Sequence, residues 1–246
     1  MTMNPIRLLD VSVDLPVLSV QARSLRKTVM NLSTGGRLMK NDQNKILVRA
    51  LANVSFELMD GDRLGLIGHN GSGKSTLLRT LAGIYRVSAG HVAIQGRVVS
   101  ILDPATGLNP DASGRENIGL LGRYMGHSRV QIEAAVEAIT DFAGLGAFID
   151  MPVKSYSQGM VGRLAFAVGT HWEHEIVLMD EWIAVADDAF KASAFERLNN
   201  LMSSARCVVV ASHDQDLLRR LCNKVLVLKH GTVSYFGPIE HMAMAA

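Results

Sequence analysis

The chain has 246 residues, which fits one large domain or one domain with a subdomain inserted in it. Hydrophobic residues make up 48% of the chain, so a sizeable core is possible. A formal net charge of +2 argues against a dedicated nucleic-acid binder, and two cysteines are too few for a disulfide framework.

The amino-terminal region predicts strands at Leu8–Val13 and Ile46–Leu58, where short apolar runs occur. Asp10 and Asp14 argue against a secretory signal, and no run approaches 18 apolar residues, so we expect a cytosolic protein without a membrane span. Residues 21–49 are basic. This segment is either a solvated face or a surface for anionic lipid head groups or a partner. Its basic residues are Arg23, Arg26, Lys27, Arg37, Lys40, Lys45 and Arg49, with Asp42 the only acidic residue.

Residues 68–76 match the phosphate-binding pattern G-x-x-x-x-G-K-[ST]. The apolar run Leu64–Ile67 precedes them and a helical pattern follows, as the motif requires. Its glycines let several backbone N–H groups turn toward one phosphate, and the helix adds its positive end. Lys74 is expected to reach the β- and γ-phosphates, and Ser75 to bind Mg²⁺. The loop therefore predicts binding of a nucleoside triphosphate. The expected contact residues are Gly68, His69, Asn70, Gly71, Ser72, Gly73, Lys74, Ser75 and Thr76.

Beyond the loop, short apolar runs alternate with helical patterns, which predicts a parallel sheet covered by helices. His91–Ile94 and Arg97–Leu102 are expected to pair as a hairpin about Gln95-Gly96. Residues 113–169 read as an all-helical subdomain inserted into a single α/β domain, residues 1–246. The helices expected there are Glu116–Met125, Ser128–Phe142 and Gln158–Gly169, and the later strands Ile176–Met179, Cys207–Ala211 and Lys224–Leu228. Cys207 is expected to be a small buried hydrophobic residue.

Three later segments carry candidate chemistry. Ser157 is suited to cap the helix that follows, and Gly159 permits close approach of the backbone to a ligand. This helix start is either an anion site or simply a capped helix. An apolar strand ends in Asp180 and Glu181; the first can hold Mg²⁺ through water, and the second can deprotonate an attacking water. A second strand presents His213 at the same edge, where a γ-phosphate contact is expected.

The order of phosphate loop, helical insert, Tyr156–Met160, Asp-Glu strand and histidine resembles the ATP-binding cassette (ABC) ATPases over nearly the whole chain. Tyr156–Met160 is similar to that family's signature, commonly Leu-Ser-Gly-Gly-Gln. The resemblance implies a P-loop ATPase core that uses ATP and Mg²⁺. It also implies a homodimer in which two subunits face head to tail. Each ATP would then lie between one copy's phosphate loop and the other copy's Ser157, Gln158 and Gly159.

The same resemblance assigns three further residues. Asp187 falls in the D-loop, and Asp103 falls near the glutamine that usually links Mg²⁺ to the transporter interface. The family usually stacks an aromatic residue on adenine ahead of the phosphate loop, but no Phe, Tyr or Trp precedes Phe56 here. We therefore expect Lys45, or Ile46, to contact the base by cation–π or apolar contact.

His171 and His174 resemble a metal pair only superficially and are expected in a surface turn.

Tyr156–Met160, Trp182 after Asp-Glu, and Gly114–Asn117 resemble the branch that exports bacterial surface polysaccharides such as O-antigen, capsule and teichoic acid. This implies integral-membrane permease partners and a place on the cytoplasmic face of the inner membrane. Some O-antigen exporters carry an extra carboxyl-terminal carbohydrate-binding domain, which is not expected in a chain that ends at Ala246. An ABC exporter for a drug or short lipid stays an alternative. A soluble ABC ATPase acting on ribosomes or DNA is disfavoured, because paired cassettes and a long coiled coil are absent.

Overall fold

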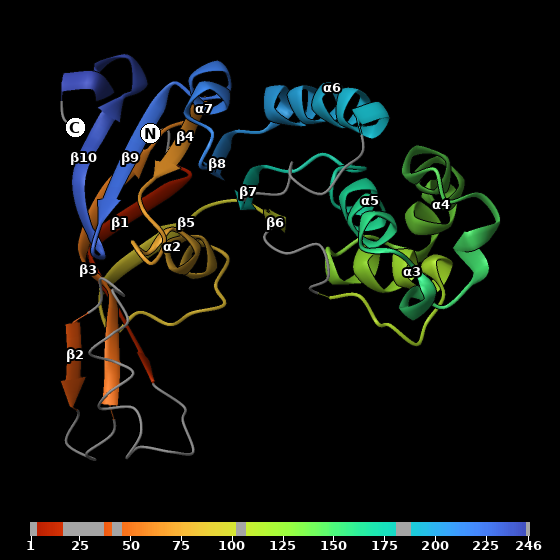
Figure 1. Ribbon diagram of the computed structural model, residues 1–246, viewed down its shortest axis with the longest axis horizontal. Coiled ribbons are helices and arrows are strands. Elements are labelled where there is room, and N and C mark those ends of the chain that lie inside the picture. Colours follow the sequence, from red (N-terminus) through yellow and green to blue (C-terminus); the bar gives the residue numbers. More distant parts are fainter. Residues whose placement is uncertain (1–3, 17–36, 41–45, 102–106, 181–187, 245–246) are drawn as a thin grey trace. The chain divides into compact units, whose positions relative to one another are not determined.

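The structure is a computed structural model that describes residues 4–16, 37–40, 46–101, 107–180 and 188–244 (Figure 1). The chain forms two compact units. Unit 1 comprises Met1–Gly96 with Arg206–Ala246, and unit 2 comprises Arg97–Ala205. No helix within the described ranges is long and apolar enough to cross a membrane.

One sheet of unit 1 is antiparallel, with the order β2-β3-β1-β5. Side chains of a strand point alternately to opposite faces, and Ile6 and Leu8 of β1 are accordingly buried on one face. Arg49 donates two hydrogen bonds to the carboxylate of Asp14, at 2.8 and 3.0 Å, and so holds the pKa of that carboxyl below its usual value. The four strands are β1 (Ile6–Pro16), β2 (Arg37–Lys40), β3 (Ile46–Leu58) and β5 (Ala89–Ile94).

The other strands of unit 1 lie side by side in the order β10-β9-β4-β8. Strand β4 runs parallel to both β8 and β9, whereas β10 is antiparallel to β9. All residues of β8 are buried, as is typical of a central parallel strand. Helix α2 (Lys74–Leu81) contacts β8, and α7 (Gln215–Leu221) contacts β4. The strands are β4 (Asp62–Ile67), β8 (Cys207–Ala211), β9 (Lys224–Lys229) and β10 (Thr232–Pro238), and the short helix η4 (Ile239–Met244) follows.

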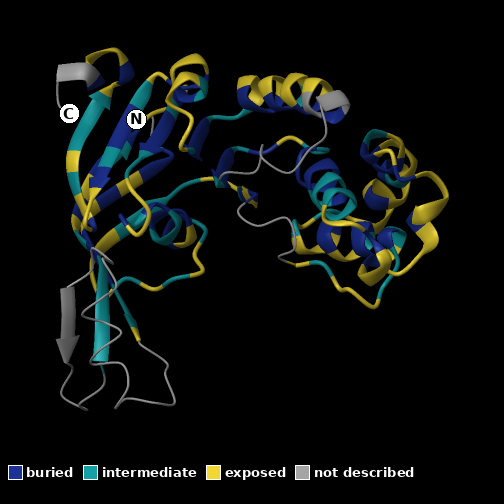
Figure 2. Cartoon of the chain, in the orientation of Figure 1, coloured by how far each residue is buried: buried dark blue, intermediate teal, exposed yellow. Residues whose placement is uncertain are grey.

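Unit 2 has a helical core, with buried residues on the faces that its helices turn toward one another (Figure 2). Capping boxes explain two helix starts: Ser113 pairs with Glu116 before α3, and Ser128 pairs with Gln131 before α4. The helices of this core are α3 (Gly114–Tyr124), α4 (Arg129–Ala143), η1 (Gly146–Asp150), η2 (Val153–Ser155) and α5 (Gln158–Gly169). The parallel strands β6 (Val98–Ile101) and β7 (Ile176–Asp180) and helix α6 (Asp188–Ser204) belong to the same unit.

The expected hairpin about Gln95-Gly96 is wrong. Strand β5 pairs antiparallel with β1, where Ile94 lies opposite Ile6, and β6 pairs parallel with β7. The two segments belong to different units. Val99 and Ile101 of β6 are buried, so long-range apolar contacts outweigh the local turn signal.

Both cysteines are buried, as expected for Cys207. Burial raises the pKa of the Cys207 thiol and of the Cys222 thiol to about 12. Neither side chain is exposed to solvent in the folded chain.

Candidate functional site: the phosphate loop and its partners

The phosphate loop joins β4 to α2 through glycines that the surroundings require. Gly71 and Gly73 have φ angles of 79° and 111°, in the left-handed region that favours glycine. A Cβ on Gly73 would lie 2.8 Å from a methyl carbon of Leu51. A Cβ on Gly68 would lie 2.5 Å from the carbonyl oxygen of Leu228. Glycine is therefore needed for space as well as for backbone conformation.

Polar groups inside the loop are positioned for an oxygen-rich ligand. Lys74 is only 7% exposed, and its Nζ donates to the carbonyl of Gly68 at 2.7 Å. Gly73 stands at the N-cap of α2 and offers no side-chain acceptor to the first N–H groups of that helix, which are the donors that bind anions. The hydroxyl of Ser72 is buried and has no hydrogen-bond partner among the residues that the structure describes. These features fit a phosphate group.

A brace that sequence analysis does not identify supports the loop from the turn between β9 and β10. The amide of Gly231 donates to the carbonyl of Ser72 at 2.9 Å, and the carbonyl of Gly231 accepts from the amide of Ala52 at 2.8 Å. The imidazole rings of His230 and His69 have centres 4.8 Å apart. A His-Gly pair after a strand is a turn signal, but it does not say which distant loop the turn will touch.

His213 lies at the same sheet edge as the phosphate loop. Leu66 of β4 is opposite Ala211 of β8 in a parallel pair, so both strands end at this edge of unit 1 (Figure 1). The side chain of His213 is exposed. The residue after it, Asp214, caps α7 by accepting a hydrogen bond from the amide of Leu217 at 3.0 Å. The contact between His213 and a γ-phosphate stays a prediction.

Unit 2 carries the second group of predicted residues. The four residues of β7 before Asp180 are fully buried, and Asp180 itself is half-buried at the end of the strand. Ser157 caps α5, because its Oγ accepts a hydrogen bond from the amide of Met160 at 3.2 Å. Gln158 is exposed and Gly159 half-buried in the first turn of α5. An accessible helix start is thus present at the predicted signature.

The remaining predicted residues, Lys45, Asp103, Glu181 and Asp187, lie outside the described residues. The same holds for most of the basic segment 21–49. Their predicted roles stay predictions.

The expected surface turn at His171–His174 is wrong for its last residue. His174 is buried, and burial lowers its pKa to about 4. His171 is half-buried; its pKa is lowered by burial first and then by the charge of Arg197. Both imidazoles are therefore neutral near pH 7, which lowers the cost of burying them. No group of three or more His, Cys, Asp or Glu within the described part of the chain could hold a metal ion.

Known proteins with a similar sequence indicate the family of this chain. The family model described as "ABC transporter" matches residues 51–184. The chain is 41% identical over 224 residues to the O-antigen export system ATP-binding protein RfbE of Yersinia enterocolitica, covering 91% of this chain and 94% of RfbE. It is 35% identical over 202 residues to the teichoic acids export ATP-binding protein TagH of Lactococcus lactis, covering 82% of this chain and 43% of TagH. The chain thus spans less than half the length of that TagH.

A solved structure supports the fold. The dimeric structure of an ATP-binding cassette in a post-hydrolysis state, bound to ADP and Pi, aligns with a TM-score of 0.72 at 19% identity. The alignment covers 95% of this chain and 98% of that chain. The predicted α/β fold with a P-loop core and a helical region is confirmed, and the chain belongs to the ABC transporter family as an ATP-binding subunit that is a P-loop ATP hydrolase.

Proposed function

We propose that the chain hydrolyses ATP to drive export of a lipid-linked surface polysaccharide, of O-antigen, capsule or teichoic-acid type, across the inner membrane. The observation that carries this proposal is the 41% identity to RfbE over 94% of that protein, because the two chains correspond over nearly their whole length. The resemblance to TagH, by name a teichoic acids export ATP-binding protein, supports a cell-surface polymer as the cargo.

The phosphate loop binds the triphosphate of ATP in this proposal. Backbone N–H groups of residues 68–76 and the start of α2 surround the phosphates, while Lys74 gives up its bond to the Gly68 carbonyl and contacts the β- and γ-phosphates. Lys45 contacts the adenine base. The brace by Gly231 keeps the loop in place while Lys74 changes partners.

The hydroxyl of Ser75 and the carboxylates of Asp180 and Asp103 are hard oxygen donors, which suits Mg²⁺. Mg²⁺ held by these residues would neutralise charge on the β- and γ-phosphates. Glu181 takes the proton of the attacking water, and His213 contacts the γ-phosphate from the edge that it shares with the loop.

The proposed assembly is a homodimer bound to membrane permease subunits at the cytoplasmic face of the inner membrane. The exposed start of α5, with Ser157, Gln158 and Gly159, supplies amides and a hydroxyl to the ATP on the other copy's phosphate loop. Asp187 takes the place of the family's D-loop in this proposed assembly. Segment 113–169 and the loop with Asp103 transmit hydrolysis to the permease.

The test is Lys74→Ala in living cells of the source organism. Loss of the ammonium group that contacts the phosphates should leave the long-chain glycan synthesised but retained inside the cell on its lipid carrier. Lys229→Ala, which removes an exposed lysine, is the matched control and should export normally. Immunoblots confirm equal protein levels, and lipid extraction measures the retained glycan. Normal display of every surface polysaccharide in the Lys74→Ala cells, with a different cargo retained, would overturn the proposed cargo.

A further inference from the structure

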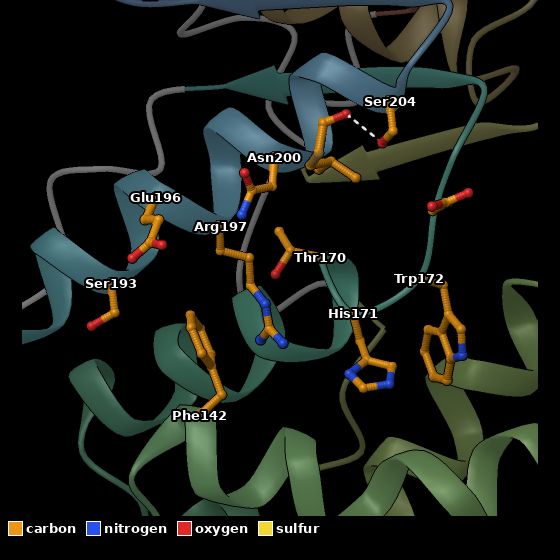
Figure 3. Close-up of a pocket in the computed structure, with 11 residues that line it drawn as sticks. Phe142, Thr170, His171, Trp172, Ser193, Glu196, Arg197, Asn200 and Ser204 are labelled. Carbon is orange, nitrogen blue, oxygen red and sulfur yellow. Dashed lines mark hydrogen bonds between the residues drawn. The ribbon is translucent and has the colours of Figure 1, made fainter.

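Unit 2 contains a pocket that is lined by a polar face of α6. Ser193, Glu196, Arg197, Asn200 and Ser204 are spaced by three and four residues, so they share one side of the helix. They line a cavity of about 380 Å³ (Figure 3). Ser193, Glu196, Asn200 and Ser204 are exposed, whereas Arg197 is half-buried, so the pocket is an open groove with a polar wall.

Arg197 is the central group of this pocket. Its guanidinium lies over the ring of Phe142, at the end of α4, with Cζ 3.7 Å from the ring centre. Figure 3 shows it between Phe142 and the imidazole of His171. Among the residues that the structure describes, the Nη1 of Arg197 is buried and has no hydrogen-bond partner, and the same holds for the Nδ1 of His171.

Two side chains that line one pocket each carry a buried nitrogen without a described partner, which needs an explanation, because buried polar groups in folded proteins are nearly always hydrogen-bonded. One of these nitrogens belongs to a guanidinium, which is always charged. The ring of Phe142 covers one face of that group, whereas its N–H donors lie along its edge. A guanidinium edge matches the paired oxygens of a carboxylate or a phosphate.

We propose that this pocket binds a small hydroxylated organic anion, a sugar phosphate or a sugar acid, whose anionic group contacts Arg197 and His171. The cavity volume falls in the range of small-molecule pockets, about 300–1,000 Å³. Glu173 and Glu196 also line the pocket and would repel a bare anion, but they accept hydrogen bonds from ligand hydroxyls. The amide of Asn200 adds a donor and an acceptor.

This site is separate from the phosphate loop, and ATP hydrolysis as proposed above uses none of its residues. Its walls come from α6, the end of α4 and residues 170–173 after α5. A bound ligand therefore contacts α6 as well as the end of α4 and the segment after α5. It adds a small-molecule site to the ATPase, beyond the proposed cargo and its permease.

The tryptophan in the pocket provides the assay. The chain has two tryptophans, Trp172 and Trp182, so Trp182→Phe leaves Trp172 as the only indole. Trp172 lines the pocket and stacks on His127, with ring centres 4.1 Å apart and planes at 19°. In this full-length variant, glucose 1-phosphate or glucuronate should change the Trp172 emission saturably. The two ligands show whether a phosphate or a carboxylate is preferred, and inorganic phosphate tests an anion without hydroxyls.

Arg197→Gln should weaken the binding of the better ligand at least about tenfold, because the charged fork is lost. The matched control is Arg129→Gln, an equal loss of charge at an arginine whose side chain is 89% exposed. It should leave binding unchanged, and neutral glucose should give no response. If Arg197→Gln does not fold, as judged by circular dichroism, His171→Leu takes its place. The proposal is overturned if no anion gives a saturable response, if glucose responds equally, or if the pocket variant binds as the control does.

Discussion

Replacement of Gly231 by alanine should weaken ATP binding, although no residue of the phosphate loop itself is substituted. Gly231 has a φ of 79°, and a Cβ there would lie 2.6 Å from the carbonyl oxygen of Ala50 and 3.1 Å from the carbonyl carbon. These are backbone atoms, so the clash can be relieved only if the turn between β9 and β10 moves by a few tenths of an ångström. That movement strains the hydrogen bond from the Gly231 amide to Ser72.

Gly61→Ala separates the backbone strain from the loop effect. Gly61 has a similar φ of 87°, but a Cβ there would meet no atom within 4 Å. Both substitutions carry the left-handed strain of about 1–2 kcal/mol. Only Gly231→Ala also weakens a bond to the loop, worth about 1 kcal/mol, which corresponds to a dissociation constant for ATP about fivefold higher.

Calorimetric titration with a non-hydrolysable ATP analogue measures this difference, and urea unfolding measures the strain. Gly61→Ala should lower the free energy of unfolding. Its dissociation constant for the analogue should stay within about twofold of the original, a smaller change than the one expected for Gly231→Ala. Equal affinities for the two variants would refute the reasoning, because the brace would then contribute nothing to the loop.

Three further outcomes concern hydrolysis, assembly and acid stability. Glu181→Gln should lower the ATPase rate about 100- to 10,000-fold and keep nucleotide binding, since Lys74 and Ser75 remain; near-normal turnover in a steady-state assay would contradict the role of general base. A mixture of Lys74→Ala and Ser157→Arg subunits should regain ATP-driven dimerisation in analytical ultracentrifugation, because one site per dimer is intact; failure at every ratio, with both variants folded, speaks against the head-to-tail arrangement. When the pH is lowered from 6.5 to 4.5, the free energy of unfolding should fall less for His174→Asn than for the original chain. The folded pKa of about 4 lies below the ordinary value of 6.5, so stability present above pH 6.5 is lost as the pH falls, by about 2 kcal/mol. Urea titrations at both pH values that show the same loss for both chains would exclude His174 as the cause.

The sequence predicted those elements whose pattern is contained in a few consecutive residues. The phosphate loop is specified by glycines that the backbone needs, and its pattern is visible in nine consecutive residues. Strand β8 is a continuous apolar run between helices, and its observed bounds, Cys207–Ala211, equal the predicted ones. Helix α5 also matches, because Ser157 caps it where expected. In each case the residues of the segment itself carry the signal, although β8 is held in place by its pairing with β4.

Elements whose partners are distant could not be predicted. The turn at Gln95-Gly96 suggested a hairpin, but Ile94 pairs with β1 and Val99 with Val177 of β7. Nor did any pattern show that Gly231 contacts Ser72, or that His174 would be buried. These outcomes depend on which surfaces meet in the fold, and a sequence window of a few residues does not contain that information.

Because both native cysteines are buried, they should react only slowly with thiol reagents in the folded protein. The sequence holds no other cysteine, and a pKa of about 12 leaves roughly one thiol in ten thousand as thiolate at pH 8. A maleimide dye should therefore react with a single exposed cysteine introduced in place of Ser157 far faster than with Cys207 or Cys222. Site-specific labels for following subunit association can be attached without first removing the native thiols.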